Sequence, residues 1–96
     1  MSVFNLSCII CAYNEAPRIA DVLSVARAHR LLHELIVVDD GSTDGTADIV
    51  RSFPSVRLIS YPENRGKSQA FAEGLRVAKN AYIMYLDVGL TGSQRS

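Results

Sequence analysis

The sequence predicts an α/β protein, a three-layer βαβαβαβ arrangement built on a Rossmann-like parallel sheet. Two observations carry this prediction. Apolar segments with strand character alternate with stretches of helical periodicity along nearly the whole chain. The connections between them are short, which is typical of right-handed crossovers between parallel strands. With 96 residues, the chain is long enough for one small domain.

The first strand and helix are expected at residues 4–12 and 16–29. The strand is apolar on both faces, which is typical of a central strand in a parallel sheet. Pro17 suits the first turn of the helix, where its missing N–H is not needed. The apolar side chains that recur at helical spacing are Ile19, Val22, Leu23 and Ala26.

The second strand, residues 34–39, ends in two carboxylates, Asp39 and Asp40. We expect Ser42 or Thr43 to cap the helix that follows, because their side-chain oxygens can accept backbone N–H bonds. One carboxylate of the pair could cap this turn instead. For the pair taken in isolation, that structural role is as good an interpretation as a functional one.

The third strand spans residues 56–61 and leads into a polar loop. Ser68 or a neighbour is expected to open the third helix, and Asn80 is expected to cap its end. A fourth strand is expected at residues 81–87. It completes the predicted domain, which spans residues 1–87. Residues 88–96 lack periodicity and are expected to be a disordered tail.

The strand order 3-2-1-4 would make the first strand central, in keeping with its two apolar faces. This order places a topological switch point between the first and fourth strands, and ligands bind outside the carboxyl ends of strands at such points. The residues at those ends are Tyr13, Asn14, Asp39, Asp40 and Asp87. One aromatic ring and three carboxylates therefore converge on one crevice, which indicates a nucleotide-type site.

Charge and hydropathy argue against several classes of function. Ten basic residues balance ten acidic ones, which disfavours broad attraction to nucleic acid or to anionic membranes. The longest apolar run, residues 81–86, is far shorter than the ~20 residues that span a bilayer. The chain begins without a basic and apolar leader, so we expect a cytoplasmic protein.

The spacing of two short motifs argues against the sites that such motifs usually form, a disulfide or zinc site and a P-loop. Cys8 and Cys11 lie about 10 Å apart on opposite faces of a strand, so they are expected to be buried thiols rather than a disulfide or zinc site. The Gly-Lys-Ser run at residues 66–68 matches only the end of a P-loop, because Tyr61 occupies the position of its first glycine. Lys67 at a helix start still favours an anion.

Four segments, in this order and at this spacing, resemble successive blocks of glycosyltransferase family 2. They are residues 8–15, 36–46, 63–67 and 82–87. The second, which contains Val-Val-Asp-Asp-Gly-Ser-Thr-Asp-Gly-Thr, is nearly diagnostic by itself. The resemblance implies the N-terminal half of a GT-A fold. It also implies inverting transfer of a sugar from a UDP- or GDP-sugar to an acceptor hydroxyl, usually with Mg²⁺ or Mn²⁺.

The resemblance also implies a set of donor-binding positions. They are Cys11, Ala12, Tyr13, Glu15, Asp40, Arg65, Lys67 and Asp87. Tyr13 and the backbone of the two residues before it would hold the nucleobase, and Asp40 would accept a hydrogen bond from that base. The two basic residues would lie near the diphosphate. Asp87 would be the first acid of a D-x-D motif that holds the metal.

The chain departs from the family pattern after Asp87. Where the family has a second acid, this sequence has Gly89, which weakens the expected metal site. The acceptor-binding half, with the carboxylate that would deprotonate the acceptor, is not among these residues, so no catalytic residue is assigned. We expect a donor-binding half-domain that is inactive alone. A fragment, a truncated gene product and a degenerate relative all fit this pattern.

Two alternatives come from other classes. A non-catalytic nucleotide-binding or oligomerising module would use the apolar edge strand at residues 82–86, because an uncovered edge invites pairing with another chain. A phospho-receiver domain also carries paired acids on a parallel sheet. Its acids would follow the first strand, whereas here they follow the second.

Overall fold

The computed structural model describes residues 5–88, which form strands and helices in the expected alternation. The elements are β1 (Leu6–Ala12), α1 (Ala16–Arg27), β2 (Leu32–Asp40), α2 (Thr46–Arg51), β3 (Val56–Tyr61), α3 (Lys67–Val77) and β4 (Tyr82–Asp87). Each has the type that the sequence predicts. Within the described residues, no helix is long and apolar enough to cross a membrane.

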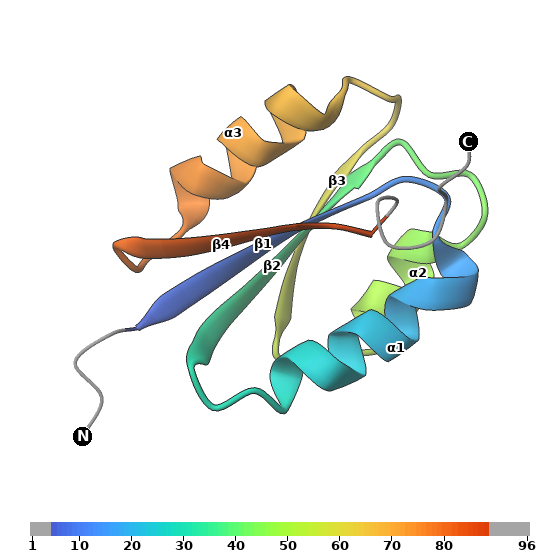
Figure 1. Ribbon diagram of the computed structural model, residues 1–96. Helices are drawn as coiled ribbons and strands as arrows, with labels where there is room; N and C mark the ends of the chain where they lie inside the picture. Colours follow the sequence, from blue (N-terminus) through green and yellow to red (C-terminus); the bar gives the residue numbers. More distant parts are fainter. Residues whose placement is uncertain (1–4, 89–96) are drawn as a thin grey trace.

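The four strands are parallel and lie in the order β3-β2-β1-β4, which confirms the predicted topology. β1 pairs with β2 on one side and with β4 on the other, so it is central. Figure 1 shows α1 and α2 on one face of the sheet and α3 on the other. The fold therefore has the three predicted layers.

The core lies on both faces of β1, as the apolar sequence of this strand predicts. Successive strand side chains point to opposite faces, so Cys8 and Ile10 pack on the α1 side while Ile9 and Cys11 pack on the α3 side. Both thiols are free and buried. α3 packs closely against β1 because of Gly74, where a Cβ atom would lie 2.5 Å from Ile9 Cγ2.

The start of α2 corrects the sequence prediction. α2 begins at Thr46 and is preceded by Gly45, which has a left-handed φ of 92°. Neither Ser42 nor Thr43 caps this helix. Both are instead hydrogen-bonded to Asn14 in another loop, which makes the connection from β2 longer than expected.

The start of α3 agrees with the prediction, whereas its end differs. The helix begins at Lys67, a neighbour of Ser68, and it ends at Val77. Asn80 is therefore not its cap. The Asn80 side chain donates from Nδ2 to Ser7 Oγ at 3.0 Å, so it ties the end of the α3–β4 connection to the start of the central strand.

Several other boundaries move by one or two residues. α1 ends at Arg27, two residues earlier than predicted, and β2 begins at Leu32, two residues earlier. Val88, which the sequence assigns to the tail, is fully buried in the core cluster on the α1 side. The remaining residues of the predicted tail, 89–96, lie outside the described part of the chain.

Candidate functional site

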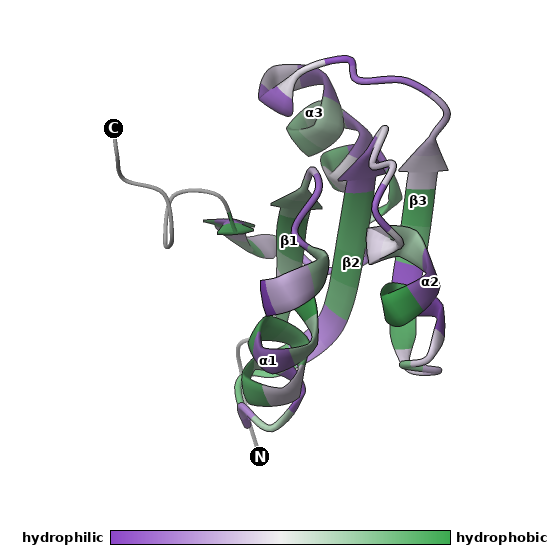
Figure 2. Ribbon diagram, turned by 90° about the vertical axis from the view of Figure 1, so that its right-hand side faces the viewer, coloured by the Kyte–Doolittle hydropathy of each residue, from purple (hydrophilic) through white to green (hydrophobic). Residues whose placement is uncertain are grey.

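The carboxyl ends of the four strands lie at one edge of the sheet, where the predicted site residues meet. In register, Cys11 of β1 lies beside Asp87 of β4, and Asp40 of β2 lies beside Tyr61 of β3. Figure 2 shows largely hydrophobic strands leading into hydrophilic loops. The strand order thus brings together side chains that are far apart in the sequence.

The first two loops at this edge are fastened to each other through Asn14. Its backbone N–H donates to Ser42 Oγ at 2.8 Å, and its side-chain Oδ1 accepts the N–H of Thr43 at 2.8 Å. Asn14 has a left-handed φ of 52°, a conformation that asparagine tolerates better than most residues. The Ser-Thr pair therefore joins two loops rather than capping a helix.

Asp44 is a second fastening residue that sequence reasoning missed. Its carboxylate accepts the N–H and the hydroxyl of Thr46 and the N–H of Ala16. These hydrogen bonds, above all the one from the Thr46 hydroxyl, lower the pKa of Asp44. Thr46 Oγ1 in turn accepts the N–H of Glu15 at 3.0 Å. The sequence signal for this role was the position of Asp44 two residues before the start of α2, where a carboxylate can accept backbone N–H bonds.

Glu15 is one of the predicted donor-binding residues, and its side chain is turned toward α1. Its Oε1 lies 2.8 Å from Arg18 Nη2 in an ion pair, and the residue is only 7% exposed. Cys11 and Ala12 are each 3% exposed, and the contact of their backbone with a nucleobase stays a prediction. Tyr13, by contrast, is 48% exposed.

Asp40 holds the β3–α3 loop. Its Oδ1 accepts the N–H of Arg65 at 2.7 Å and its Oδ2 accepts the N–H of Gly66 at 3.0 Å, while its carbonyl accepts Asn64 Nδ2. The loop packs so tightly that a Cβ on Gly41 would lie 2.4 Å from the Asn64 nitrogen. Asp40 is 4% exposed, and the contact with a nucleobase that the family resemblance implies stays a prediction.

Asp39 has the structural role that the sequence left open for one member of the pair. Its Oδ1 accepts the N–H of Ser42 at 3.2 Å, and its Oδ2 accepts the Ser60 hydroxyl at 3.1 Å. The residue is 2% exposed. Asp39 therefore stabilises the turn after β2 and ties β2 to β3.

Arg65 lies over an aromatic ring beside the loop held by Asp40. Its guanidinium carbon is 4.6 Å from the centre of the Tyr61 ring, within the range of a cation–π contact. Burial, followed by the charge of Glu73, raises the pKa of Tyr61. The stacking orients a guanidinium at the carboxyl edge, next to β2.

Lys67, the first residue of α3, is joined to the end of β4. Its Nζ lies 2.6 Å from Asp87 Oδ2, and the lysine side chain is 65% exposed whereas the Asp87 side chain is 6% exposed. The hydrogen bond to Asp87 raises the pKa of Lys67. Cys11 lies below this pair, and burial is the main cause that raises its pKa, with smaller effects from Asp87 and Asp40.

The acidic residues of this edge offer little to a divalent cation. Between residues 5 and 88, no group of three or more His, Cys, Asp or Glu side chains has an arrangement that could hold a metal ion. Asp87 is paired with Lys67, and the oxygens of Asp39 and Asp40 accept bonds from neighbouring loops. Hard cations need several oxygen ligands, and the described residues alone do not supply such a set.

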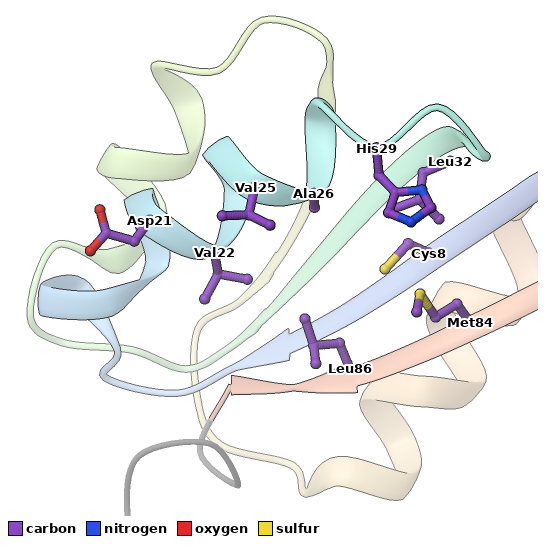
Figure 3. Close-up of a pocket in the computed structure, with 9 residues that line it drawn as sticks. All are labelled: Cys8, Asp21, Val22, Val25, Ala26, His29, Leu32, Met84 and Leu86. Atoms are coloured by element: carbon purple, nitrogen blue, oxygen red, sulfur yellow. The ribbon is translucent and has the colours of Figure 1, made fainter.

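Two cavities flank β4. The larger, about 420 Å³, lies between α1 and β4, away from the carboxyl edge, and its lining is almost entirely apolar (Figure 3). The smaller, about 270 Å³, lies beside the Lys67–Asp87 pair and is lined by Lys67, Ser68, Phe71 and Tyr85. Only the smaller one adjoins the candidate site.

A parallel sheet with this strand order defines an α/β protein of the Rossmann-like class, in which ligands bind at the carboxyl edge of the sheet. Comparison with known families makes the class specific. The family model for glycosyl transferase family 2 matches residues 7–88, and the chain belongs to this family. Its fold is the GT-A type that the resemblance implies.

Curated relatives are sugar transferases. The chain is 35% identical over 89 residues to a poly-β-1,6-N-acetyl-D-glucosamine synthase of Staphylococcus epidermidis. This match covers 88% of this chain and 22% of the synthase. It is 34% identical to a dolichyl-phosphate β-glucosyltransferase of Dictyostelium discoideum, and this match covers 85% of this chain and 30% of the transferase. The chain therefore spans less than a third of the length of either relative.

Solved structures show the same fold. A mannosyltransferase of Pyrobaculum calidifontis in complex with GDP-Man and Mn²⁺ matches with a TM-score of 0.80 and 32% identity over 91% of this chain and 28% of that one. Glucosyl-3-phosphoglycerate synthase of Mycobacterium tuberculosis, in complex with Mn²⁺, UDP and glucosyl-3-phosphoglycerate, matches with a TM-score of 0.76 and 26% identity. The second match covers 88% of this chain and 33% of the synthase.

Proposed function

We propose that residues 5–88 are the donor-binding part of a family 2 glycosyltransferase and bind a UDP- or GDP-sugar at the carboxyl edge of the sheet. One observation carries the proposal: an exposed aromatic ring from the β1–α1 loop, buried carboxylates at the strand ends and two basic side chains at the start of α3 gather at that edge. Family membership supports it. The solved relatives described above hold GDP-Man or UDP.

The nucleobase binds against Tyr13. Its half-exposed ring offers a face for stacking, and base–aromatic stacking contributes about 1–3 kcal/mol. The backbone of Cys11 and Ala12 lies next to it. Asp40 accepts a base N–H, as the family resemblance implies, while its present bonds hold the loop that carries Arg65.

The diphosphate binds between the β3–α3 loop and the start of α3. Arg65 supplies a guanidinium that can bind phosphate in a bidentate manner. Lys67 supplies an ammonium, and the first amides of α3 add the positive end of the helix dipole. These groups would stabilise the charge that develops on the diphosphate as the sugar leaves.

Inverting transfer further requires a base that takes the proton of the acceptor hydroxyl while its oxygen attacks the sugar opposite the diphosphate. We assign no residue between 5 and 88 to that role. The contribution of this segment ends with donor binding and stabilisation of the leaving group, so the 96-residue chain shows no turnover alone. The expected cytoplasmic location stays a prediction.

The first prediction is that a nucleoside diphosphate stabilises the chain thermally. UDP, GDP and CDP are compared in a melting assay, each with EDTA and with Mn²⁺, and one of them raises the Tm. Tyr13→Ala removes most of that rise. Tyr82→Ala is the matched control, because this tyrosine is 49% exposed but lies at the opposite end of the sheet. If no nucleotide changes the Tm, the proposed function is wrong.

A second candidate function is supported by the edge of the sheet. β4 pairs with β1 on one side, and three large hydrophobic side chains of this strand are exposed to solvent: Tyr82, Met84 and Tyr85. The other edge strand, β3, carries the exposed charge of Arg57. An apolar edge without charges favours pairing with another strand. A homo-oligomer through β4 is the form of this candidate that can be tested directly.

A further inference from the structure

The position expected for a metal at the carboxyl edge contains an ammonium. Lys67 Nζ lies 2.6 Å from Asp87 Oδ2, at the distance of a strong charge-assisted hydrogen bond. Asp87 is 6% exposed, and its position on β4, beside Cys11 of the central strand, is determined by the sheet. A divalent cation at this oxygen would have to displace Lys67 or share one carboxylate with it.

Among the described residues, the other acids at this edge do not form a metal-binding group with Asp87. Asp40 accepts two backbone N–H groups with its two oxygens, and Asp39 accepts a backbone N–H and a hydroxyl. Two positions after Asp87 the sequence has Gly89, which has no side chain to contribute. On this side of the site, the charge of the Asp87 carboxylate is therefore already neutralised by Lys67.

We infer that Lys67 takes the place of the divalent cation on Asp87, so that this chain binds a nucleoside diphosphate without a metal. The inference rests on the proposed function and specifies how that site tolerates a diphosphate. A buried carboxylate at this edge repels phosphate oxygens, and the ammonium removes that repulsion. The Lys67 side chain is 65% exposed, so its ammonium can contact a phosphate while it remains paired with Asp87.

The inference predicts that two substitutions change nucleotide affinity in opposite directions. Lys67→Met exposes the charge of Asp87 to the diphosphate and is expected to weaken nucleotide binding about tenfold or more. Asp87→Asn removes the repulsion and releases the ammonium, so binding is expected to be unchanged or several-fold tighter. A carboxylate that holds a metal behaves in the opposite way, because its amide variant loses the metal and with it the diphosphate.

The test is isothermal titration of each variant with UDP and GDP, in EDTA and in Mn²⁺. Lys79→Met is the control, because it makes the same change in net charge at an exposed lysine just beyond α3. The inference is supported if affinity is equal in EDTA and Mn²⁺, if Lys67→Met binds more weakly, and if Asp87→Asn binds equally well or more tightly. Binding that requires Mn²⁺ and is lost in Asp87→Asn overturns it while the proposed function stands.

A separate measurement needs no nucleotide. Free Mn²⁺ is followed by electron paramagnetic resonance as the chain is added, and no depletion of the free ion is expected for the wild type. Depletion that disappears in Asp87→Asn would overturn the inference by itself. If no nucleotide binds under any condition, the proposed function fails and the inference fails with it. Circular dichroism melts confirm that each variant is folded.

Discussion

At the scale of single residues, burial controls the chemistry of Cys8. The side chain is 1% exposed, and removal from water raises the pKa of its thiol from 9.0 to about 11, because the thiolate is disfavoured there. Above pH 9 the unfolded chain loses this proton while the folded chain keeps it. The contribution of this residue to stability is therefore complete below pH 9 and falls as pH rises toward 11, by about 3 kcal/mol at most.

This prediction is checked by urea unfolding between pH 8 and 10.5. Cys8→Ala lowers stability at every pH because it leaves a small cavity. Its stability should also decline less steeply with pH than that of the wild type, because one thiol that titrates differently in the two states is gone. Identical slopes for the two proteins would contradict the assignment to Cys8.

At the scale of elements, the loops at the carboxyl edge are held by side chains from other elements. The clearest case is Asp40 of β2, which accepts the N–H groups of Arg65 and Gly66. In Asp40→Ala both amides lose their acceptor, which is expected to destabilise the fold by about 2–4 kcal/mol. Hydrogen exchange at these two amides should accelerate more than exchange in the central strand.

Asp48→Ala is the control for this prediction. Asp48 is on α2, its side chain is 83% exposed, and it pairs only with Arg51 on the same helix among the contacts of the described residues. Removing an exposed ion pair of this kind changes stability by less than about 1 kcal/mol. Equal effects of the two substitutions would show that Asp40 does not hold the loop.

At the scale of the whole molecule, the exposed edge of β4 predicts self-association. Size-exclusion chromatography with light scattering should show a species of twice the 10.5 kDa chain mass at high protein concentration. Met84→Lys places a charge on the edge and should restore the monomer. Leu31→Lys, at a similarly exposed site in a loop, should not. A monomer at all concentrations would exclude this second function.

The order of the elements could be predicted because it depends on local patterns. A strand that is apolar on both faces must be central, and β1 is central. The three-residue spacing of Cys8 and Cys11 placed them on opposite faces, where the two core clusters contain them. Alternation of strands and helices then required parallel strands and crossovers, because short loops allow few other arrangements.

The errors have one physical cause, which is competition from partners distant in the sequence. Ser42 and Thr43 have the composition of helix caps, but Asn14, which is 28 and 29 residues away in sequence, takes their hydrogen bonds. Asn80 resembles a cap and instead reaches Ser7. A local pattern states which bonds a side chain can make. The folded chain decides which partner is close enough to make them.

The family, the parallel sheet and the edge at which the charged residues gather could be predicted from the residues in order, because periodicity and motif order are properties of the linear chain. The folded structure sets how those charges are used. It paired Lys67 with Asp87 and directed Asp40 to the backbone of the β3–α3 loop. Such pairings depend on distances of a few ångströms between separate elements, and strand register sets those distances.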